Sequence, residues 1–144
     1  MKGPIQSVEV SYLLHATEDP QRLDEAVKAM ISSDTPPDVE ELEGHFGNRI
    51  LRVRFHLTGD EASRAFSGIV ARLPQQLRDD LTNNLGTHLD EHVALFLRLD
   101  KQRLVSGFLA MGTADPVRVK VKPRTFLLRG GAQQLYSRLL GDGE

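Results

Sequence analysis

The chain has 144 residues, a length that suits one domain, and 26% of its residues are charged. It contains no cysteine, which excludes disulfide bonds, thiolate zinc sites and cysteine nucleophiles. The formal net charge of −2 argues against a protein that coats nucleic acid indiscriminately. We see no signal-peptide pattern and no apolar stretch long enough to span a membrane, so we expect a cytoplasmic protein without a membrane partner.

The charge is distributed unevenly along the chain. Residues 1–45 carry three basic and ten acidic side chains, whereas residues 97–144 carry nine basic and four acidic ones. Two interpretations remain open. Either the two ends neutralise each other when they pack together, or the C-terminal part forms a local basic surface for a polyanion.

The N-terminal third predicts a strand, a helix and a β-hairpin. Apolar residues alternate over 8–14, as in a strand, and a helix follows with Thr17 as its cap and Pro20 in its first turn. Strands over 39–44 and 50–57 flank the sequence HFGN, which predicts a hairpin turn with Gly47 or Asn48 at positive φ.

A four-residue turn in this hairpin places Glu41 opposite Arg52. We interpret that pair, and the acidic run Glu40-Glu41-Leu42-Glu43 as a whole, as cross-strand charge pairing. The Asp79-Asp80 pair is interpreted as part of a solvated helix face.

The second half predicts two helices, a strand, a short helix and a further strand. The Thr58–Glu61 spacing is that of a capping box, which opens a helix that ends at Pro74. A second helix follows and stops at Gly86. The remaining elements are expected over residues 93–99 (strand), 101–108 (helix) and 117–122 (strand).

This order of elements predicts an α+β fold, with a single mixed, largely antiparallel sheet, helices packed on one of its faces, and a C-terminal helix. We divide the chain into an α/β domain over 1–123 and an extension over 124–144. A hinge at Gly130-Gly131 precedes a short amphipathic helix, which we expect to dock on the same subunit or, alternatively, to form a homodimer contact. The docking side chains are Ala132, Leu135, Tyr136, Leu139 and Leu140.

The chain offers little that supports catalysis. His88-Leu89-Asp90-Glu91-His92 matches the zinc-peptidase pattern H-x-x-E-H, but that chemistry needs a helix, and Gly86 together with the following strand predicts a turn. No phosphate-binding glycine-rich loop and no nucleophile elbow are present. We therefore expect no enzymatic activity, no cofactor and no metal site.

The last two strands suggest a binding surface. Their polar faces bring basic residues together with one aromatic residue that can stack on a base, and only Asp100 and Asp115 oppose them. An ordinary polar outer face of a half-covered sheet would carry similar residues. The candidate RNA-binding residues are Phe96, Arg98, Lys101, Arg103, Arg118, Lys120, Lys122 and Arg124, and, at the hairpin tip, His45, Asn48 and Arg49.

Several stretches resemble an archaeal family of RNA-binding proteins that are predicted accessory subunits of the exosome. They are HATED from His15, ELEGHFGNRI from Glu41 and LRLDKQ from Leu97, and Asp115-Pro116 with the following strand fits the family's closing strand. The similarity runs from about residue 5 to 123. Arg49 departs from it, because a proline is expected there, and residues 124–144 lie outside the shared region.

The resemblance implies a fold similar to that of the large-subunit ribosomal protein that binds 5S RNA, and RNA as the partner. It implies no catalytic residue. The leading hypothesis is a non-catalytic RNA-binding accessory of archaeal RNA processing or decay, associated with the exosome. The alternative is a protein-interaction adaptor or dimerisation module that does not contact RNA directly.

Overall fold

The computed structural model describes residues 4–44, 47–124 and 127–142. The elements in this part of the chain, in order, are β1 (Ile5–His15), α1 (Pro20–Ile31), β2 (Asp38–Glu43), β3 (Arg49–Thr58), α2 (Gly59–Arg72), α3 (Gln75–Asn83), α4 (Leu85–His88), β4 (Leu95–Leu99), α5 (Lys101–Val105), β5 (Val117–Pro123) and α6 (Arg129–Asp142).

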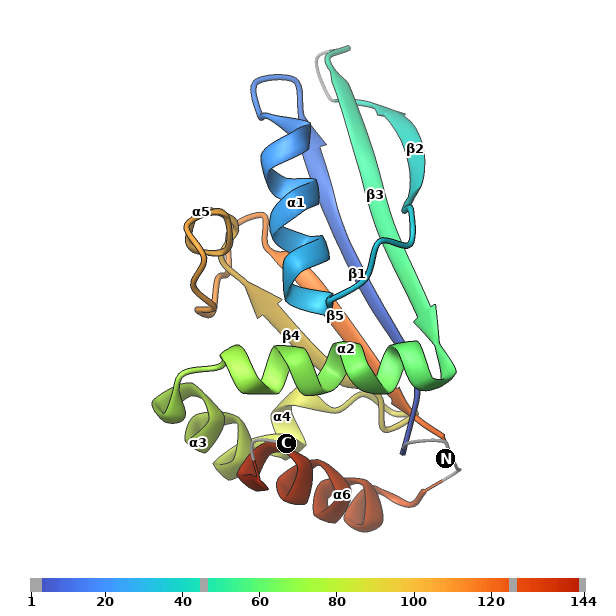
Figure 1. Ribbon diagram of the computed structural model, residues 1–144, viewed down its shortest axis with the longest axis vertical. Helices are drawn as coiled ribbons and strands as arrows, with labels where there is room; N and C mark the ends of the chain where they lie inside the picture. The colour runs from blue at the N-terminus through green and yellow to red at the C-terminus, as the bar shows by residue number, and fades with distance from the viewer. Residues whose placement is uncertain (1–3, 45–46, 125–126, 143–144) are drawn as a thin grey trace.

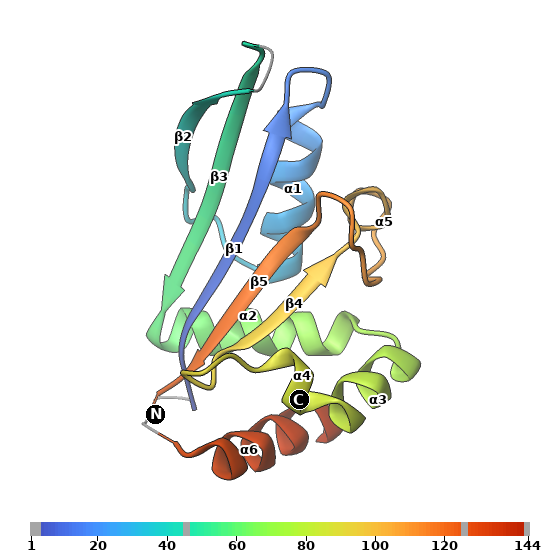
Figure 2. The same ribbon diagram turned by 180° about the vertical axis from the view of Figure 1, so that it is seen from behind.

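The five strands form one sheet in the order β2-β3-β1-β5-β4. Every pair of neighbouring strands is antiparallel, which confirms the predicted α+β class and makes the sheet antiparallel throughout. Helices α1 and α2 lie against one face (Figure 1). The view from behind shows the strands of the other face with no helix in front of them (Figure 2).

Strand alternation explains why one face is covered and the other is not. Successive side chains of a strand point to opposite faces, so an apolar residue at every second position gives one apolar face. Val8 and Val10 on β1, Phe55 on β3 and Val119 on β5 are fully buried beneath the helices. The intervening residues, such as Arg54 and Arg118, are exposed. The alternation thus leaves a polar sheet face open to ligands.

The C-terminal helix docks on its own subunit, as the sequence predicts. α6 packs beside α3 and α4 at one end of the sheet (Figures 1 and 2). Ala132, Tyr136 and Leu140 are fully buried, and the Tyr136 hydroxyl donates towards the carbonyl oxygens of Val93 at 3.4 Å and Val121 at 3.2 Å. Burial of this phenol raises its pKa. The expected hinge is wrong, because Gly130-Gly131 lies inside α6.

Two predicted helix caps differ from the structure. The cap of α1 is Asp19 and not Thr17, since the Asp19 carboxylate accepts the Gln21 amide at 3.0 Å. Thr58 caps α2 without a side-chain hydrogen bond, so the capping box does not form. The Glu61 carboxylate accepts instead from the hydroxyls of Ser33 and Thr35, each at 2.7 Å. Those hydrogen bonds lower the pKa of Glu61 and tie the segment after α1 to α2.

The β2–β3 hairpin has a five-residue connection, one residue longer than predicted. Glu43 pairs with Arg49, so Glu40 and not Glu41 lies opposite Arg52. Gly47 has φ 78°, as the turn sequence predicts, and its amide donates to the Gly44 carbonyl at 3.0 Å. This one-residue difference moves each β2 side chain to the other face relative to β3.

The segment with the zinc-peptidase pattern is a turn, as predicted, although α4 includes Gly86 and ends at His88. The Asp90 carboxylate accepts the amides of His92 and Ala94, each at 2.9 Å, and turns the chain. Val93 takes φ 57°, so the next strand starts at Leu95 and not at 93. Among the described residues, no helix is both long enough and apolar enough to cross a bilayer.

Candidate nucleic-acid interface

The open face of the sheet carries a row of residues that crosses all five strands. In register order the row is Asp38, Arg54, Ser11, Arg118 and Arg98. Neighbouring strands are about 4.8 Å apart, so the three arginines of this row span roughly 15 Å across the sheet. The row makes the middle of the open face cationic.

A second row lies next to the first on the same face. It consists of His56, Glu9, Lys120 and Phe96. The Lys120 ammonium lies over the Phe96 ring, 5.4 Å from its centroid, in a cation–π contact that orients both side chains. Lys122 follows Lys120 two positions along β5 and is exposed. We call Arg54, Phe96, Arg98, Arg118, Lys120 and Lys122 the basic sheet face.

Few carboxylates neutralise this surface. Glu9 lies 3.9 Å from both Arg54 and His56, and Glu40 lies 3.9 Å from Arg52 at the β2 edge. In the described parts of the chain, no carboxylate forms an ion pair with Arg98, Arg118, Lys120 or Lys122. Arg98 and Arg118 are directly opposite each other, an arrangement that costs stability because like charges repel. The charge on β4 and β5 is therefore available to an anion.

The sequence reasoning missed the contribution of β3 to this face. The sequence pattern predicts Arg52 only as the cross-strand partner of a β2 carboxylate, and neither Arg54 nor His56 is among the predicted site residues. The signal was present, because these residues alternate with buried Val53, Phe55 and Leu57. What was lacking was the strand order, which places β3 next to β1 and so brings its arginines towards Arg118.

A shallow hollow separates the arginines of β3 and β5. Its volume is about 250 Å³, and its lining includes Ser11, Leu13, Arg52 and Arg118. Asp115 also lines this hollow. A guanidinium binds phosphate oxygens through paired hydrogen bonds, so Arg52 and Arg118 could bind a phosphate group there, with one carboxylate opposing it.

Other predicted site residues lie elsewhere. Arg103 is exposed on α5, a helix that contacts α1 on the covered side of the sheet. Arg124 is half-buried after the end of β5, where its amide donates to the Pro4 carbonyl at 2.7 Å. Asn48 and Arg49 are exposed at the hairpin tip, with Arg49 3.5 Å from Glu41. His45 lies outside the described residues.

Lys101 is not part of the basic sheet face, which corrects its predicted place there. Its side chain is 8% exposed, and its ammonium contacts Glu18 at 3.1 Å, Asp115 at 2.7 Å and the Leu13 carbonyl oxygen. The physical reason is that β4 ends at Leu99, and Asp100 caps α5. Strand alternation therefore no longer determines the direction of the next side chain.

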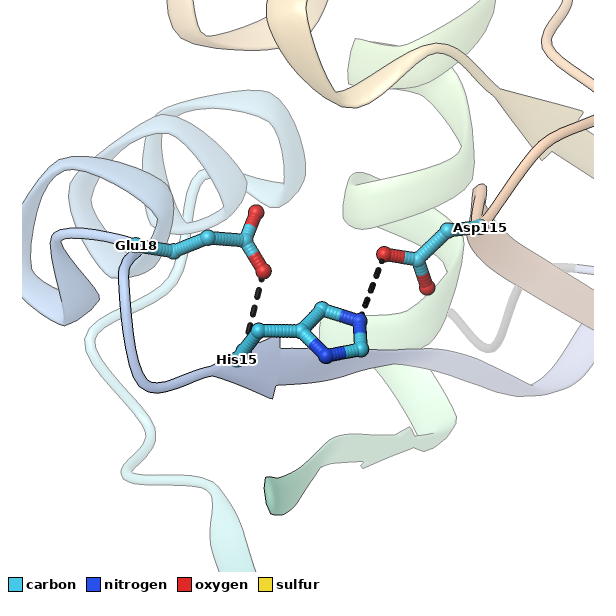
Figure 3. Close-up of side chains that lie close together, drawn as sticks. All are labelled: His15, Glu18 and Asp115. Atoms are coloured by element: carbon cyan, nitrogen blue, oxygen red, sulfur yellow. Dashed lines mark hydrogen bonds and ion pairs between the residues drawn. The ribbon is translucent and has the colours of Figure 1, made fainter. Parts of the chain in front are cut away.

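The carboxylates that hold Lys101 also contact His15. The His15 amide donates to Glu18 at 2.9 Å, and its imidazole Nε2 lies 3.0 Å from Asp115 Oδ2 (Figure 3). Burial of Asp115 by itself would raise its pKa, but the hydrogen bonds and positive charge of Lys101, with a contribution from His15, lower that pKa overall. We call His15, Glu18, Lys101 and Asp115 the lysine cluster.

The geometry of the lysine cluster also resembles a small metal site. Ligand atoms of His15, Glu18 and Asp115 all lie within 4.8 Å of one another. However, the Lys101 ammonium already pairs with both carboxylates. A divalent ion bound there would be repelled by the positive charge of that ammonium at close range. The cluster joins HATED, LRLDKQ and Asp115, three of the stretches on which the family resemblance rests. We interpret it as a structural connection.

Fold and surface together define a class of protein: a small α+β domain whose antiparallel sheet leaves one cationic face uncovered. Residues 7–123 match a protein family described as RNA binding, and the chain belongs to that family.

Two curated relatives and one solved structure show how far the similarity extends. The chain is 29% identical over 138 residues to a Pyrococcus abyssi protein named RNA-binding protein PAB1135, with 90% of each chain covered. It is 30% identical to an uncharacterized protein, MJ0213, of Methanocaldococcus jannaschii, with 78% of this chain and 80% of that protein covered. The structure of Mth689, a DUF54 protein from Methanothermobacter thermautotrophicus, aligns with a TM-score of 0.79 at 27% identity and covers 96% of this chain and 99% of that chain.

The coverage of that structure also bears on the C-terminal segment. An alignment over 96% of this chain includes most of residues 124–144, so the segment is shared with this solved relative. The family model itself ends at residue 123, where the sequence predicts the end of the region shared with the family.

Proposed function

We propose that the protein binds RNA through the basic sheet face and acts without catalysing a reaction. The observation that carries the proposal is the register pair Arg98–Arg118, with Lys120 and Lys122 beside it. None of the four forms an ion pair with a described carboxylate, although Glu9 lies opposite Lys120 in the register and pairs with Arg54 and His56. Side chains at alternate positions of β5 are about 6.8 Å apart, so Arg118, Lys120 and Lys122 form a regular line of cations suited to successive phosphates. The family description and the name of the Pyrococcus relative support the same partner.

The experiment compares salt dependence of RNA affinity in two charge-reversal variants. Lys120→Glu with Lys122→Glu should weaken binding to every RNA sequence and flatten the plot of log affinity against log salt by about 1.4, since each phosphate contact with single-stranded RNA contributes about 0.7. Arg22→Glu, at an exposed position of α1 on the covered side of the sheet, is the charge-reversal control and should leave the slope unchanged. Equal slopes for wild type and the folded double variant would reject the proposed surface.

The place of the protein in RNA metabolism is the finer part of the proposal. We propose an accessory of RNA processing or decay that associates with the exosome, on the strength of the family resemblance alone. Affinity purification from native lysate, with and without nuclease, tests it. Exosome subunits retained after nuclease treatment indicate direct docking, subunits lost after treatment indicate a link through RNA, and their absence in both samples rejects the association.

The non-catalytic part of the proposal has its own test. Purified protein incubated with labelled RNA and Mg²⁺ or Mn²⁺ should leave the RNA intact. Cleavage abolished by His88→Ala would revive a hydrolase at the H-x-x-E-H turn. Cleavage abolished by His15→Ala would assign one to the lysine cluster. Either result would overturn this part of the proposal and leave RNA binding itself untouched.

A further inference from the structure

A second hollow lies over β4 at the edge of the sheet. Two segments flank this strand: Leu89 forms a bridge with Leu95, and Met111 forms one with Leu99. They enclose a volume of about 350 Å³ on the same face as Phe96 and Arg98, both of which line it. A volume of this size is in the range of pockets that take small organic groups.

The lining combines flat apolar surface with a few polar groups. Leu89, Phe96 and Met111 provide the apolar part, and Met111 is 41% exposed. His88, Asp90 and Thr113 contribute the polar part. Asp90 is held in place because its Oδ1 accepts two backbone amides, while its Oδ2 accepts no hydrogen bond from a described residue. The hollow is thus lined both by an aromatic residue and by an aspartate whose carboxylate is held by the backbone.

Backbone contacts fix the wall formed by residues 111–113. The Gly112 amide donates to the Arg98 carbonyl at 3.0 Å. A Cβ atom at Gly112 would lie 2.7 Å from the Asp100 Cα atom, so only glycine lets this segment approach β4 so closely. The Lys120 ammonium on the neighbouring strand contacts the Phe96 ring and orients it. The ring, the wall and Asp90 are therefore set in position before any ligand arrives.

We propose that this hollow accepts one unpaired nucleobase of the bound RNA, which stacks on Phe96 and directs its polar edge to Asp90. This inference rests on the proposed function, because the neighbouring Arg98 and Arg118 are its phosphate contacts. Bases in a continuous duplex are stacked and paired, and an A-form helix presents mainly backbone and shallow minor groove to a protein. The preferred RNA therefore contains a single-stranded segment, a bulge or a loop.

The test uses three RNAs of one sequence: a perfect duplex, the same duplex with one bulged 2-aminopurine, and the single strand. The bulged RNA should bind about tenfold more tightly than the perfect duplex, since stacking of a base on an aromatic side chain contributes about 1–3 kcal/mol. Binding should also quench the 2-aminopurine fluorescence as the base stacks. Phe96→Leu should abolish both the quenching and the tenfold preference for the bulged RNA.

Two further variants keep the test decisive if Phe96→Leu destabilises the fold. Phe96→Tyr retains a stacking ring and should retain the preference. Met111→Ala, at an exposed position, should reduce the preference severalfold in a folded protein. Equal affinity for bulged and perfect duplexes, or quenching that survives both Phe96→Leu and Met111→Ala, would overturn the inference alone. Loss of all RNA binding by the wild-type protein would reject the proposed function itself.

Discussion

Arg98 on β4 and Arg118 on β5 lie directly opposite each other in the antiparallel register, and both are exposed. Like charges in such a pair destabilise a sheet by an amount comparable to the 0.2–1 kcal/mol that favourable pairs contribute. A polyanion bound across both strands would turn this repulsion into attraction. We therefore regard the pair as evidence of a ligand.

The first prediction separates stability from binding at this pair. Arg118→Gln should raise the free energy of unfolding by a few tenths of a kcal/mol, because it removes the repulsion from Arg98. The same variant should weaken RNA binding and lower the salt slope by about 0.7. Urea unfolding and fluorescence anisotropy measure the two effects. A loss of stability above 1 kcal/mol would show instead that Arg118 supports the fold.

The second prediction concerns the buried ammonium of Lys101. Lys101→Met should lower the free energy of unfolding by about 3 kcal/mol, near the low end of the range for a broken buried ion pair, since Glu18 and Asp115 keep some contact with water. Lys122→Met, at an exposed position, should change stability by less than about 0.5 kcal/mol. Similar effects of the two substitutions would contradict the structural role of the lysine cluster.

The third prediction is a pH dependence that originates at Asp115. Its pKa in the folded protein is below the ordinary value of 3.8, so the unfolded chain binds more protons in this range and stability falls as the pH drops. The loss should begin as the pH approaches 3.8 and continue through the lowered pKa. Asp115→Asn should be less stable than wild type at neutral pH and should lose less stability on acidification.

Urea midpoints measured between neutral pH and about pH 2.5 provide the check on Asp115. Glu91→Gln, at a fully solvated turn position, is the control and should show the same acid dependence as wild type. An Asp115→Asn protein whose stability falls with pH as steeply as that of wild type would show that other carboxylates dominate, among them Glu61, whose pKa is also lowered.

The fourth prediction tests the docking of α6. Tyr136→Ala should lower the free energy of unfolding by about 3–5 kcal/mol, because it leaves a cavity in place of a fully buried ring. The substitution also removes the edge-on contact of that ring with Phe66. Tyr136→Phe should cost about 1 kcal/mol through loss of the hydroxyl contacts. Truncation after Leu128 should lower the melting temperature and leave the oligomeric state unchanged. A change of oligomeric state without a loss of stability would favour the dimer contact.

The sequence alone determined which side chains β1, β4 and β5 would bury, because the side-chain period of a strand is two residues. That period predicted the outward direction of Phe96, Arg98, Arg118 and Lys120. The order of elements predicted the fold class, and the helical spacing of apolar residues predicted the docking side of α6. Local rules for turns also predicted positive φ at Gly47 or Asn48, and the structure has it at Gly47. These features depend on residues close together in the chain.

Only the tertiary structure decided how distant strands align. The order β2-β3-β1-β5-β4 is what places Arg54 in one row with Arg118, and no local pattern contains that order. The hairpin register differs by one residue from the predicted register, because Gly44 belongs to the turn and not to β2. Backbone hydrogen bonds across the turn, from the Gly44 amide to Asn48 and from the Gly47 amide to Gly44, fix this arrangement. Lys101 is the clearest case. Its partners Glu18 and Asp115 lie 83 and 14 positions away in the chain, and the folded chain alone brings them to its ammonium.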